Sequence, residues 1–266
     1  MTLEKSQIDQ LSRELMAAES SLIPIEPITD RFPEITIPEA YTIQLKTIET
    51  KVKSGAVIVG KKIGLTSNAM QEMFGVREPD YGHILYDNMI MEGQPIAMSR
   101  LIQPRVESEI CFLLKKDLKG PGVTTADVLA ATAGVIPAFE IIDSRIKDWK
   151  IKIQDTIADN ASNALVVLGG QLTLISNLDL RLVGLVLERD GDIVATAAGA
   201  AVWGNPVQAV AWLANTLGQY SISLRSGEFI MSGSLTAAIP AQSGSSFRAT
   251  FDHLGSVTTR FVSKRE

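Results

Sequence analysis

Two acidic residues inside an otherwise apolar, β-branched run are the first candidates for chemistry in this sequence. Glu107 and Glu109 lie within residues 104–114, whose composition predicts a β-strand. Side chains alternate between the two faces of a strand and advance by about 3.3 Å per residue, so the two carboxylates point the same way from Cα atoms about 7 Å apart. Acidic residues on a solvated strand face are common, and for this pair alone that plain role is the alternative.

A third acid strengthens the case for a metal site. Glu140 lies in residues 135–142, which are otherwise nearly all apolar, and an unpaired carboxylate is costly in such a context. A hard divalent cation would neutralise all three acids, because Mg²⁺ and Mn²⁺ take oxygen ligands and leave open positions for water and substrate. The sequence therefore predicts that Glu107, Glu109 and Glu140 bind Mg²⁺ or Mn²⁺.

Lys62 is a candidate cation for an anionic substrate. It lies among apolar residues between Gly60 and Gly64, which let the backbone approach a ligand closely. A partly desolvated lysine can have a lowered pKa and serve in proton transfer. The alternative is a lysine whose ammonium reaches the surface while its methylene groups are buried.

Asp80 and a polar cluster at residues 155–163 are further candidates. Asp80 lies in the turn-like residues 79–83, where hydrogen bonding to its own turn amides is the simpler role. The cluster supplies donors and acceptors for a polar ligand, or it caps a helical turn. Both histidines, His83 and His253, are expected to be structural, and without a cluster of His and Cys residues a zinc site is disfavoured.

The composition favours a folded chain that binds neither nucleic acid nor a membrane. Its 266 residues, 45% of them hydrophobic, are enough for a full core. The net charge of −5 and the scattered basic residues supply no field for a polyanion. The sequence starts without a signal-peptide pattern, and no apolar stretch is long enough to cross a bilayer. The single Cys111 lies in an apolar run, which indicates a packed thiol and a reducing compartment, so we expect a cytoplasmic protein.

Hydrophobic spacing predicts two helices near the start of the sequence and mainly strands after them. Residues 3–20 and about 37–52 have helical spacing, and prolines between them indicate an extended connection over residues 22–33. Residues 1–55 are therefore expected to be an N-terminal helical region, and residues 56–266 a catalytic, β-rich domain. The expected fold class is α+β.

Two further elements are predicted within the β-rich part. A strand over residues 57–67 should turn into a short helix that begins at Ser67 or Asn68 and runs through Met73. The C-terminal third reads as a β-meander with one helix after Asn205, and Asp190-Gly191 is a strong hairpin turn.

Six segments of the sequence resemble the fumarylacetoacetate hydrolase superfamily, and within it the 2-oxopent-4-enoate hydratases and 4-oxalocrotonate decarboxylases of bacterial aromatic meta-cleavage pathways. The resemblance covers nearly the whole chain, and six such motifs in this order are specific. They are Gly60-x-Lys62-Ile63-Gly64-Leu65-Thr66-Ser67, Pro79-Asp80-Tyr81-Gly82, Pro104-Arg105-Val106-Glu107-x-Glu109, Pro137-x-x-Glu140-Ile141-Ile142-Asp143-Ser144-Arg145, Ala158-Asp159-Asn160-Ala161-Ser162 and Gly255-Ser256-Val257.

The resemblance implies a mixed β-roll or β-sandwich core with flanking helices, assembled as a homo-oligomer. It implies a Mg²⁺ or Mn²⁺ ion bound by the same three glutamates that the strand pattern selects. By motif position it also implies catalytic roles for Lys62 and Asp80. Four further residues are expected to line the substrate pocket, namely Leu65, Thr66, Asp159 and Ser162. Lys61 departs from the family pattern, since many relatives carry His there.

The implied activity is hydration of a 2-hydroxy-2,4-dienoate, such as 2-hydroxypenta-2,4-dienoate, to a 4-hydroxy-2-oxoacid without an organic cofactor. Proton transfer by Lys62 and Asp80 would give a 2-oxo-3-enoate, to which water adds at C4. The alternative enzyme is a 4-oxalocrotonate decarboxylase, but Asp80 favours hydration because an acid would repel the departing carboxylate. The non-enzyme alternative is a silent structural partner in a hydratase-decarboxylase complex. A complex with a paralogous decarboxylase or a downstream aldolase is a further expectation.

Overall fold

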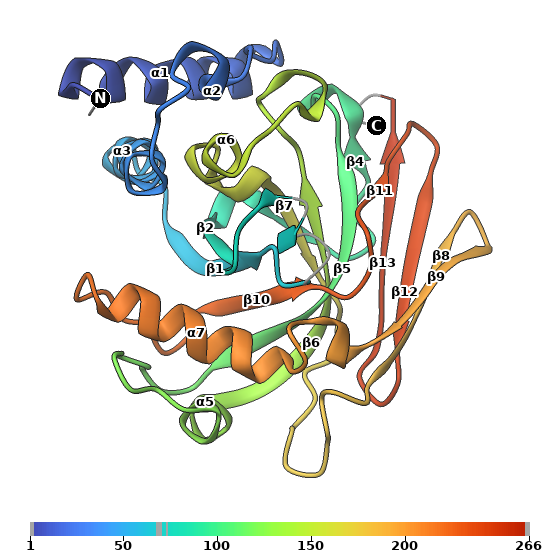
Figure 1. The fold of residues 1–266 in the computed structure, drawn as a ribbon. Coiled ribbons are helices and arrows are strands. Elements are labelled where there is room, and N and C mark those ends of the chain that lie inside the picture. The colour runs from blue at the N-terminus through green and yellow to red at the C-terminus, as the bar shows by residue number, and fades with distance from the viewer. Residues whose placement is uncertain (1–2, 68–70, 73, 264–266) are drawn as a thin grey trace.

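The computed structural model describes residues 3–67, 71, 72 and 74–263, and within them the chain forms two β-sheets with helices around them (Figure 1). The larger sheet has the strand order β2-β1-β10-β5-β6-β7-β3, with β11 paired to β5. Its strands are β1 (Ile58–Gly64), β2 (Asp80–Leu85), β3 (Met89–Met91), β5 (Arg105–Leu114), β6 (Thr132–Ile142), β7 (Asn163–Leu168), β10 (Phe229–Ser234) and β11 (Ile239–Pro240).

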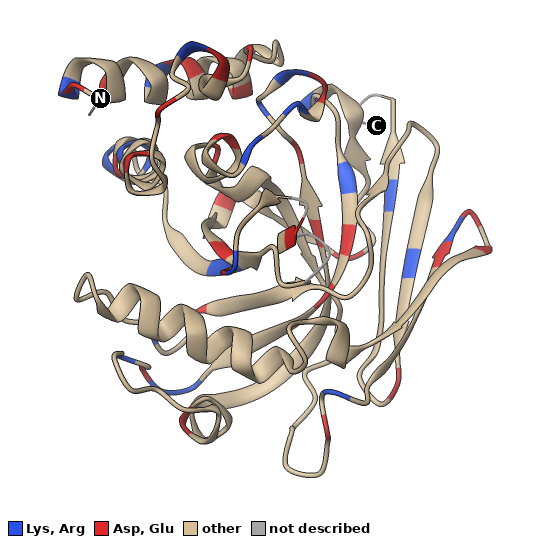
Figure 2. Ribbon diagram, in the orientation of Figure 1, with Lys and Arg blue, Asp and Glu red and all other residues tan. Residues whose placement is uncertain are grey.

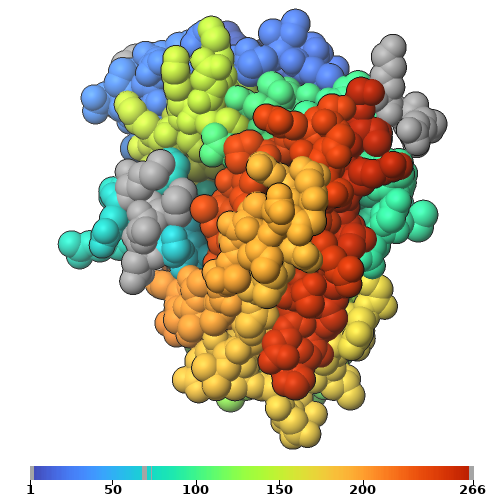
Figure 3. All heavy atoms as spheres, turned by 90° about the vertical axis from the view of Figure 1, so that its right-hand side faces the viewer, coloured from blue at the N-terminus to red at the C-terminus, as the bar shows by residue number. Residues whose placement is uncertain are grey.

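The second sheet has the strand order β4-β13-β12-β8-β9. Its strands are β4 (Ile96–Ala97), β8 (Gly184–Arg189), β9 (Asp192–Ala198), β12 (Ser246–Phe251) and β13 (Gly255–Val262). Figure 3 views this sheet from outside, with β12 and β13 in red beside the orange β8 and β9. Alternate residues of β12 and β13, such as Phe247 and Phe261, are buried in the main hydrophobic core together with Phe112 and Phe139 of the larger sheet.

Helices cover the remaining faces. They are α1 (Lys5–Ser21), α2 (Ile28–Arg31), α3 (Ile37–Lys53), α5 (Thr125–Ala131), α6 (Ile153–Ala158) and α7 (Pro206–Gly218). Helix α3 begins with a capping box, in which Thr36 and Glu39 exchange side-chain to backbone hydrogen bonds. Helix α3 packs against both α1 and α6 (Figure 1), and Leu11, Ile43 and Ile157 share one buried cluster. The N-terminal helices are thereby fixed to the loop region that follows β6.

The two longest strands of the larger sheet, β5 and β6, are antiparallel neighbours and present different residues to its two faces. On β5, Val106 and Ile110 point into the main core, whereas Glu107, Glu109 and Cys111 alternate with them and face the other side. The strand pattern that makes the core therefore also directs the acids away from it.

The expected fold class, α+β with a mixed sheet and flanking helices, is confirmed. Both acid-bearing strands, the hairpin at Asp190-Gly191 and the helix after Asn205 lie where the sequence predicts them. The short helix predicted to pass through Asn68 and Met73 involves residues outside the described part of the chain. No helix among the described residues is long and apolar enough to cross a membrane.

Three local predictions were wrong. Residues 79–83 do not form a turn, because Asp80–Leu85 pair with β1 as the fully buried strand β2. The connection over residues 22–33 contains the one-turn helix α2, which the intervening prolines tolerate because Pro27 precedes the helix as its N-cap. The C-terminal third is not a simple meander, since β10 and β11 leave it to join β1 and β5 in the larger sheet.

Candidate active site

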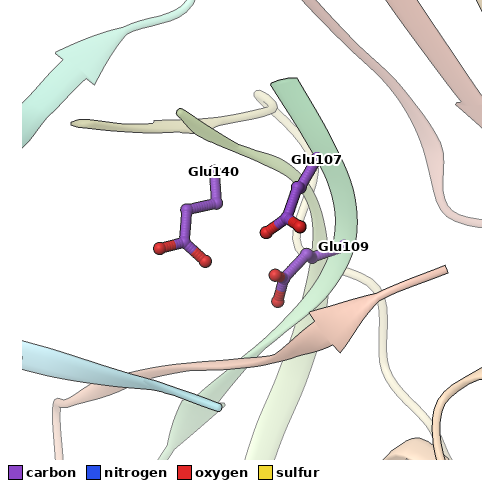
Figure 4. Close-up of side chains that lie close together, drawn as sticks. All are labelled: Glu107, Glu109 and Glu140. Atoms are coloured by element: carbon purple, nitrogen blue, oxygen red, sulfur yellow. The ribbon is translucent and has the colours of Figure 1, made fainter. Parts of the chain in front are cut away.

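Three glutamates from two neighbouring strands converge on one point. Glu107 on β5 lies directly opposite Glu140 on β6, and Glu109 follows two residues along the same face of β5. One carboxylate oxygen from each residue lies within 4.8 Å of the other two, and the side chains point toward one another (Figure 4). Glu109 and Glu140 are fully buried, while Glu107 is half-buried.

The acids are not neutralised by their hydrogen bonds alone. Glu109 Oε2 accepts a bond from the Gly233 amide at 2.7 Å, and Glu140 Oε1 accepts one from Asn163 Nδ2 at 2.9 Å. Glu109 Oε1 and Glu140 Oε2 have no hydrogen-bond partner among the described residues. Buried, unpartnered carboxylate oxygens that face one another are the donor set that a hard divalent cation prefers, so these residues fit a Mg²⁺-type ion.

Burial and the crowding of like charges raise the pKa values of two of these acids. Burial raises the pKa of Glu107 to about 7, and the negative charge of Glu140 adds to the rise. Burial likewise raises the pKa of Glu109 well above its ordinary value, with further repulsion from Glu140 and Glu107. Ionisation of these acids in the folded protein therefore carries a free-energy cost that a bound cation would offset.

Lys62 lies against this acid cluster. Its Nζ is 3.4 Å from Glu140 Oε1 and donates a hydrogen bond to the Ala161 carbonyl at 2.9 Å. Burial opposes the charged form of Lys62, but attraction to Glu140 and Asp80 outweighs it, and the pKa of the ammonium is raised. The sequence suggested that partial desolvation could lower the pKa of Lys62. The structure instead favours its charged form, so Lys62 is a cation in the site.

Asp80 is buried at the start of β2, close to Lys62. A Cβ atom on Gly64 would lie 2.2 Å from Asp80 Oδ1 and 3.2 Å from Lys62 Nζ, so both polar groups press against a position that only glycine can fill. Asp80 Oδ1 has no hydrogen-bond partner in the described part of the chain. Burial raises the pKa of Asp80, which lets this carboxyl hold a proton more readily than an exposed aspartate.

A left-handed turn supplies the carbonyl that Lys62 binds. Asn160, Ala161 and Ser162 have φ angles of +53°, +50° and +56°, and this conformation costs about 1–2 kcal/mol for each residue with a Cβ. The Asn160 side chain bonds both the N–H and the C=O of His83 on β2, at 2.8 and 2.9 Å. These bonds fasten the strained turn to the strand beside the site.

Asp159 and Arg145 secure the same turn from the other side. Arg145 donates to the Asp159 carboxylate and to the carbonyls of Asp143, Asp159 and Asn163. The Arg145 amide donates to the second carboxylate oxygen of Asp159. Asp159 was expected in the substrate pocket; in the structure its carboxylate faces Arg145. Arg145 and Asn163 belong to this support. Arg145 lies in one of the motifs of the family resemblance and Asn163 in the polar cluster, but no role in the site was predicted for either.

The other expected pocket residues lie at the same end of the sheet. Ser162 is buried, with its Oγ 3.3 Å from Thr156 Oγ1. Leu65 directly follows β1 with a φ of +55°. Thr66 is buried against Gly233, where a Cβ would lie 2.2 Å from Thr66 Oγ1. The structure thus places Leu65 and Thr66 beside the segment that bonds Glu109, and it places Ser162 in the turn that bonds Lys62.

A buried cluster of three glutamates on a mixed β-sheet is suited to a metal-dependent enzyme, and comparison with known proteins identifies the family. The chain belongs to the fumarylacetoacetate hydrolase family, because the family model described as "Fumarylacetoacetate (FAA) hydrolase C-terminal" matches residues 56–262. This confirms the resemblance seen in the sequence.

Three known proteins that are similar to this chain show which members of the family it resembles. A 2-hydroxypent-2,4-dienoate hydratase of Pseudomonas putida is 50% identical over 222 residues, which are 83% of this chain and 100% of that protein. A 2-hydroxyhexa-2,4-dienoate hydratase of Comamonas testosteroni is 45% identical over 97% of this chain and 99% of its own length. A solved structure, 4-oxalocrotonate decarboxylase from Pseudomonas putida G7 complexed with magnesium and adipate, has a TM-score of 0.95 and 39% identity, covering 98% of this chain and 99% of that one.

Proposed function

We propose that this protein is a metal-dependent hydratase that adds water to a 2-hydroxy-2,4-dienoate of the 2-hydroxypenta-2,4-dienoate type, giving a 4-hydroxy-2-oxoacid. The observation that carries the proposal is the convergence of three glutamates, Lys62 and Asp80 on one buried site. The similarity to several proteins named as hydratases of such acids, at 41–50% identity, supports the same reaction.

The proposed metal is Mg²⁺ or Mn²⁺, with Glu107, Glu109 and Glu140 as its ligands. When bound, such a cation would polarise the 2-oxygen of the substrate and make enolisation easier. Lys62 and Asp80 carry the protons: the dienol loses its 2-hydroxyl proton and gains one at C5 to give a 2-oxo-3-enoate, the oxygen of water then adds at C4, and a proton is returned to C3. The raised pKa of Asp80 suits a group that must hold a proton between these steps. Leu65, Thr66 and Ser162 are proposed to shape the pocket, and Asp159 to act on it through the left-handed turn.

A decarboxylase is the second candidate, because the decarboxylase structure superposes over almost the whole chain. Decarboxylation of an oxohexenedioate would share the metal and the oxoacid group. Asp80 favours hydration, because it is buried beside the site and, whenever it is ionised, would repel a substrate carboxylate about to leave as CO₂.

The test is to supply the purified protein with 2-hydroxypenta-2,4-dienoate and Mg²⁺ or Mn²⁺, and to follow loss of the conjugated absorbance. Hydration predicts metal-dependent loss and one 4-hydroxy-2-oxoacid formed per substrate consumed. CO₂ release from 2-oxo-3-hexenedioate without loss of the dienoate would instead assign the decarboxylase. No turnover of either acid would favour a structural partner.

Assembly, location and domain division stay predictions. We propose a homo-oligomer in the cytoplasm, able to associate with a paralogous decarboxylase or a downstream aldolase. We also propose residues 1–55 as a helical region attached to a catalytic domain of residues 56–266, which the match of the family model to residues 56–262 supports. Light scattering of the purified protein alone measures the size of the homo-oligomer. The same measurement with each candidate partner detects the proposed association.

A further inference from the structure

A cation at the open end of the acid cluster takes no part in the mechanism described above. Arg105 is the first residue of β5, and strand alternation places it on the same face as Glu107 and Glu109. Basic and acidic residues lie next to each other at the start of this strand in Figure 2. Arg105 and Glu107 are both half-buried, whereas Glu109 and Glu140 are fully buried. Arg105 therefore lies at the more exposed end of the acid cluster.

The guanidinium of Arg105 is held in place from one side. Its central carbon lies 4.6 Å from the centre of the Trp149 ring. Trp149 is itself anchored, because its Nε1 donates a hydrogen bond to the Gln103 carbonyl at 3.0 Å, in the segment that leads into β5. Stacking against an aromatic ring uses the face of the guanidinium and leaves the N–H groups at its edge available.

Those N–H groups have no hydrogen-bond or ion-pair partner among residues 3–67, 71, 72 and 74–263. Other buried cations near the site differ in this respect. Arg145 is bound to Asp159, and Lys61 is 2.8 Å from Glu228. A half-buried guanidinium that is oriented but unpaired is suited to an anion that arrives from solution.

We propose that Arg105 binds a carboxylate group of the substrate at the outer end of the acid-lined site. The inference rests on the proposed function to the extent that the substrate is an organic acid. The planar guanidinium matches a carboxylate with two parallel hydrogen bonds, and stacking on Trp149 fixes its orientation before the ligand arrives. The site otherwise contains Glu107, Glu109, Glu140 and Asp80, so a cation at its rim also lowers the repulsion that an incoming anion meets.

Two carboxylates could supply this chemistry: C1 of any 2-hydroxydienoate, or a second carboxylate at the far end of a longer diacid. The test therefore uses Arg105→Gln and Arg105→Lys with 2-hydroxypenta-2,4-dienoate and with 2-hydroxyhepta-2,4-diene-1,7-dioate. Arg105→Gln should raise KM about 10- to 100-fold and change kcat by less than about 3-fold, with partial recovery in Arg105→Lys. A rise for both substrates assigns C1, and a rise for the diacid alone assigns the far carboxylate.

A binding measurement separates this inference from the reaction itself. Calorimetric titration of the wild-type protein and of Arg105→Gln with adipate and with pyruvate needs no turnover. At least one acid should bind about 10-fold more weakly to the variant. If the wild-type protein binds these acids but hydrates no dienoate, the proposed function fails while the role of Arg105 stands. Equal affinities, or no binding of either acid to the wild-type protein, would overturn the role of Arg105.

Matched variants distinguish a binding role of Arg105 from a role in supporting the loop that contains Trp149. Arg100→Gln removes an exposed positive charge five residues earlier and should leave KM unchanged. Trp149→Leu should raise KM because the guanidinium loses its orientation, and Trp149→Phe should restore most of the wild-type value. An unchanged KM in Arg105→Gln together with a lowered melting temperature would show that Arg105 only supports Trp149, and would refute the proposal.

Discussion

Replacing Glu109 with Gln should stabilise the protein without metal and destabilise it, relative to the wild type, when Mg²⁺ is present. Glu109 is fully buried, and its carboxylate lies within 4.8 Å of those of Glu107 and Glu140. Two unit charges at that separation repel by about 3 kcal/mol at an effective dielectric constant of about 20. Because the raised pKa of Glu109 lets protonation relieve part of this repulsion, we expect a gain of about 1–3 kcal/mol.

The substituted side chain has places for both of its polar atoms. The amide oxygen of Gln can keep the hydrogen bond from the Gly233 amide, and its NH₂ group would occupy the position of Oε1, which has no partner in the described residues. From there it can donate to a neighbouring carboxylate. The fold should therefore be preserved while one metal ligand is lost.

The assay is chemical unfolding of the wild-type protein and Glu109→Gln, each with EDTA and with saturating Mg²⁺. Stabilisation by Mg²⁺ should be clear in the wild type and nearly absent in the variant. Glu188→Gln, which removes an acid from β8 in the other sheet, is the control and should keep the full response to Mg²⁺. A variant that is less stable without metal, or that retains the wild-type response, would refute the argument that the acids repel one another and share a cation.

Other consequences of the site can be measured in the same way. Without metal, stability should fall as pH rises from about 4.5 to about 7, because folded Glu107 keeps its proton up to a pKa of about 7 whereas the unfolded residue releases it near 4.5. Stabilisation by Mg²⁺ in urea unfolding should therefore grow over this range, and an equal effect at about pH 5 and about pH 7.5 would contradict the assignment. Asp80→Asn should lower kcat by about 10²- to 10⁴-fold while far-UV circular dichroism stays unchanged, and wild-type turnover would exclude proton transfer by Asp80. Asn160→Ala should lower the free energy of unfolding by about 2 kcal/mol, because two partly buried hydrogen bonds to His83 are lost. It should also reduce kcat through Lys62, and unchanged values of both would show that the turn needs no such anchor.

The elements that carry the acids could be predicted because their signals are local. The β-branched and apolar composition of residues 104–114 predicted β5, and period-two alternation placed Glu107 and Glu109 on one face. That Glu140 joins them depends on the register between β5 and β6, which sets Glu107 opposite Glu140. Register is a property of strand pairing, so the strand pattern could suggest a shared cation but could not place the third acid opposite the first two.

What could not be predicted depends on contacts between distant segments. Residues 79–83 have turn-like composition, yet pairing with β1 makes Asp80 the first residue of a buried strand. The pKa of Lys62 is raised rather than lowered because four acids from β2, β5 and β6 surround it, which no local window contains. Asp159 carries the chemistry of a ligand-binding residue, but Arg145, fourteen residues earlier, occupies its carboxylate. In each case tertiary contacts outweigh the local preference.

The left-handed turn at residues 160–162 has a consequence for the order in which the molecule assembles. A chain segment with three successive residues of this handedness has no tendency to adopt the shape by itself, so its anchors on β2 and at Arg145 must be in place first. We therefore expect the carbonyl that binds Lys62 to reach its position only after these anchors have packed. Turnover would then require the packed tertiary structure, so the recovery of activity would report that β2, Arg145 and the turn have come together.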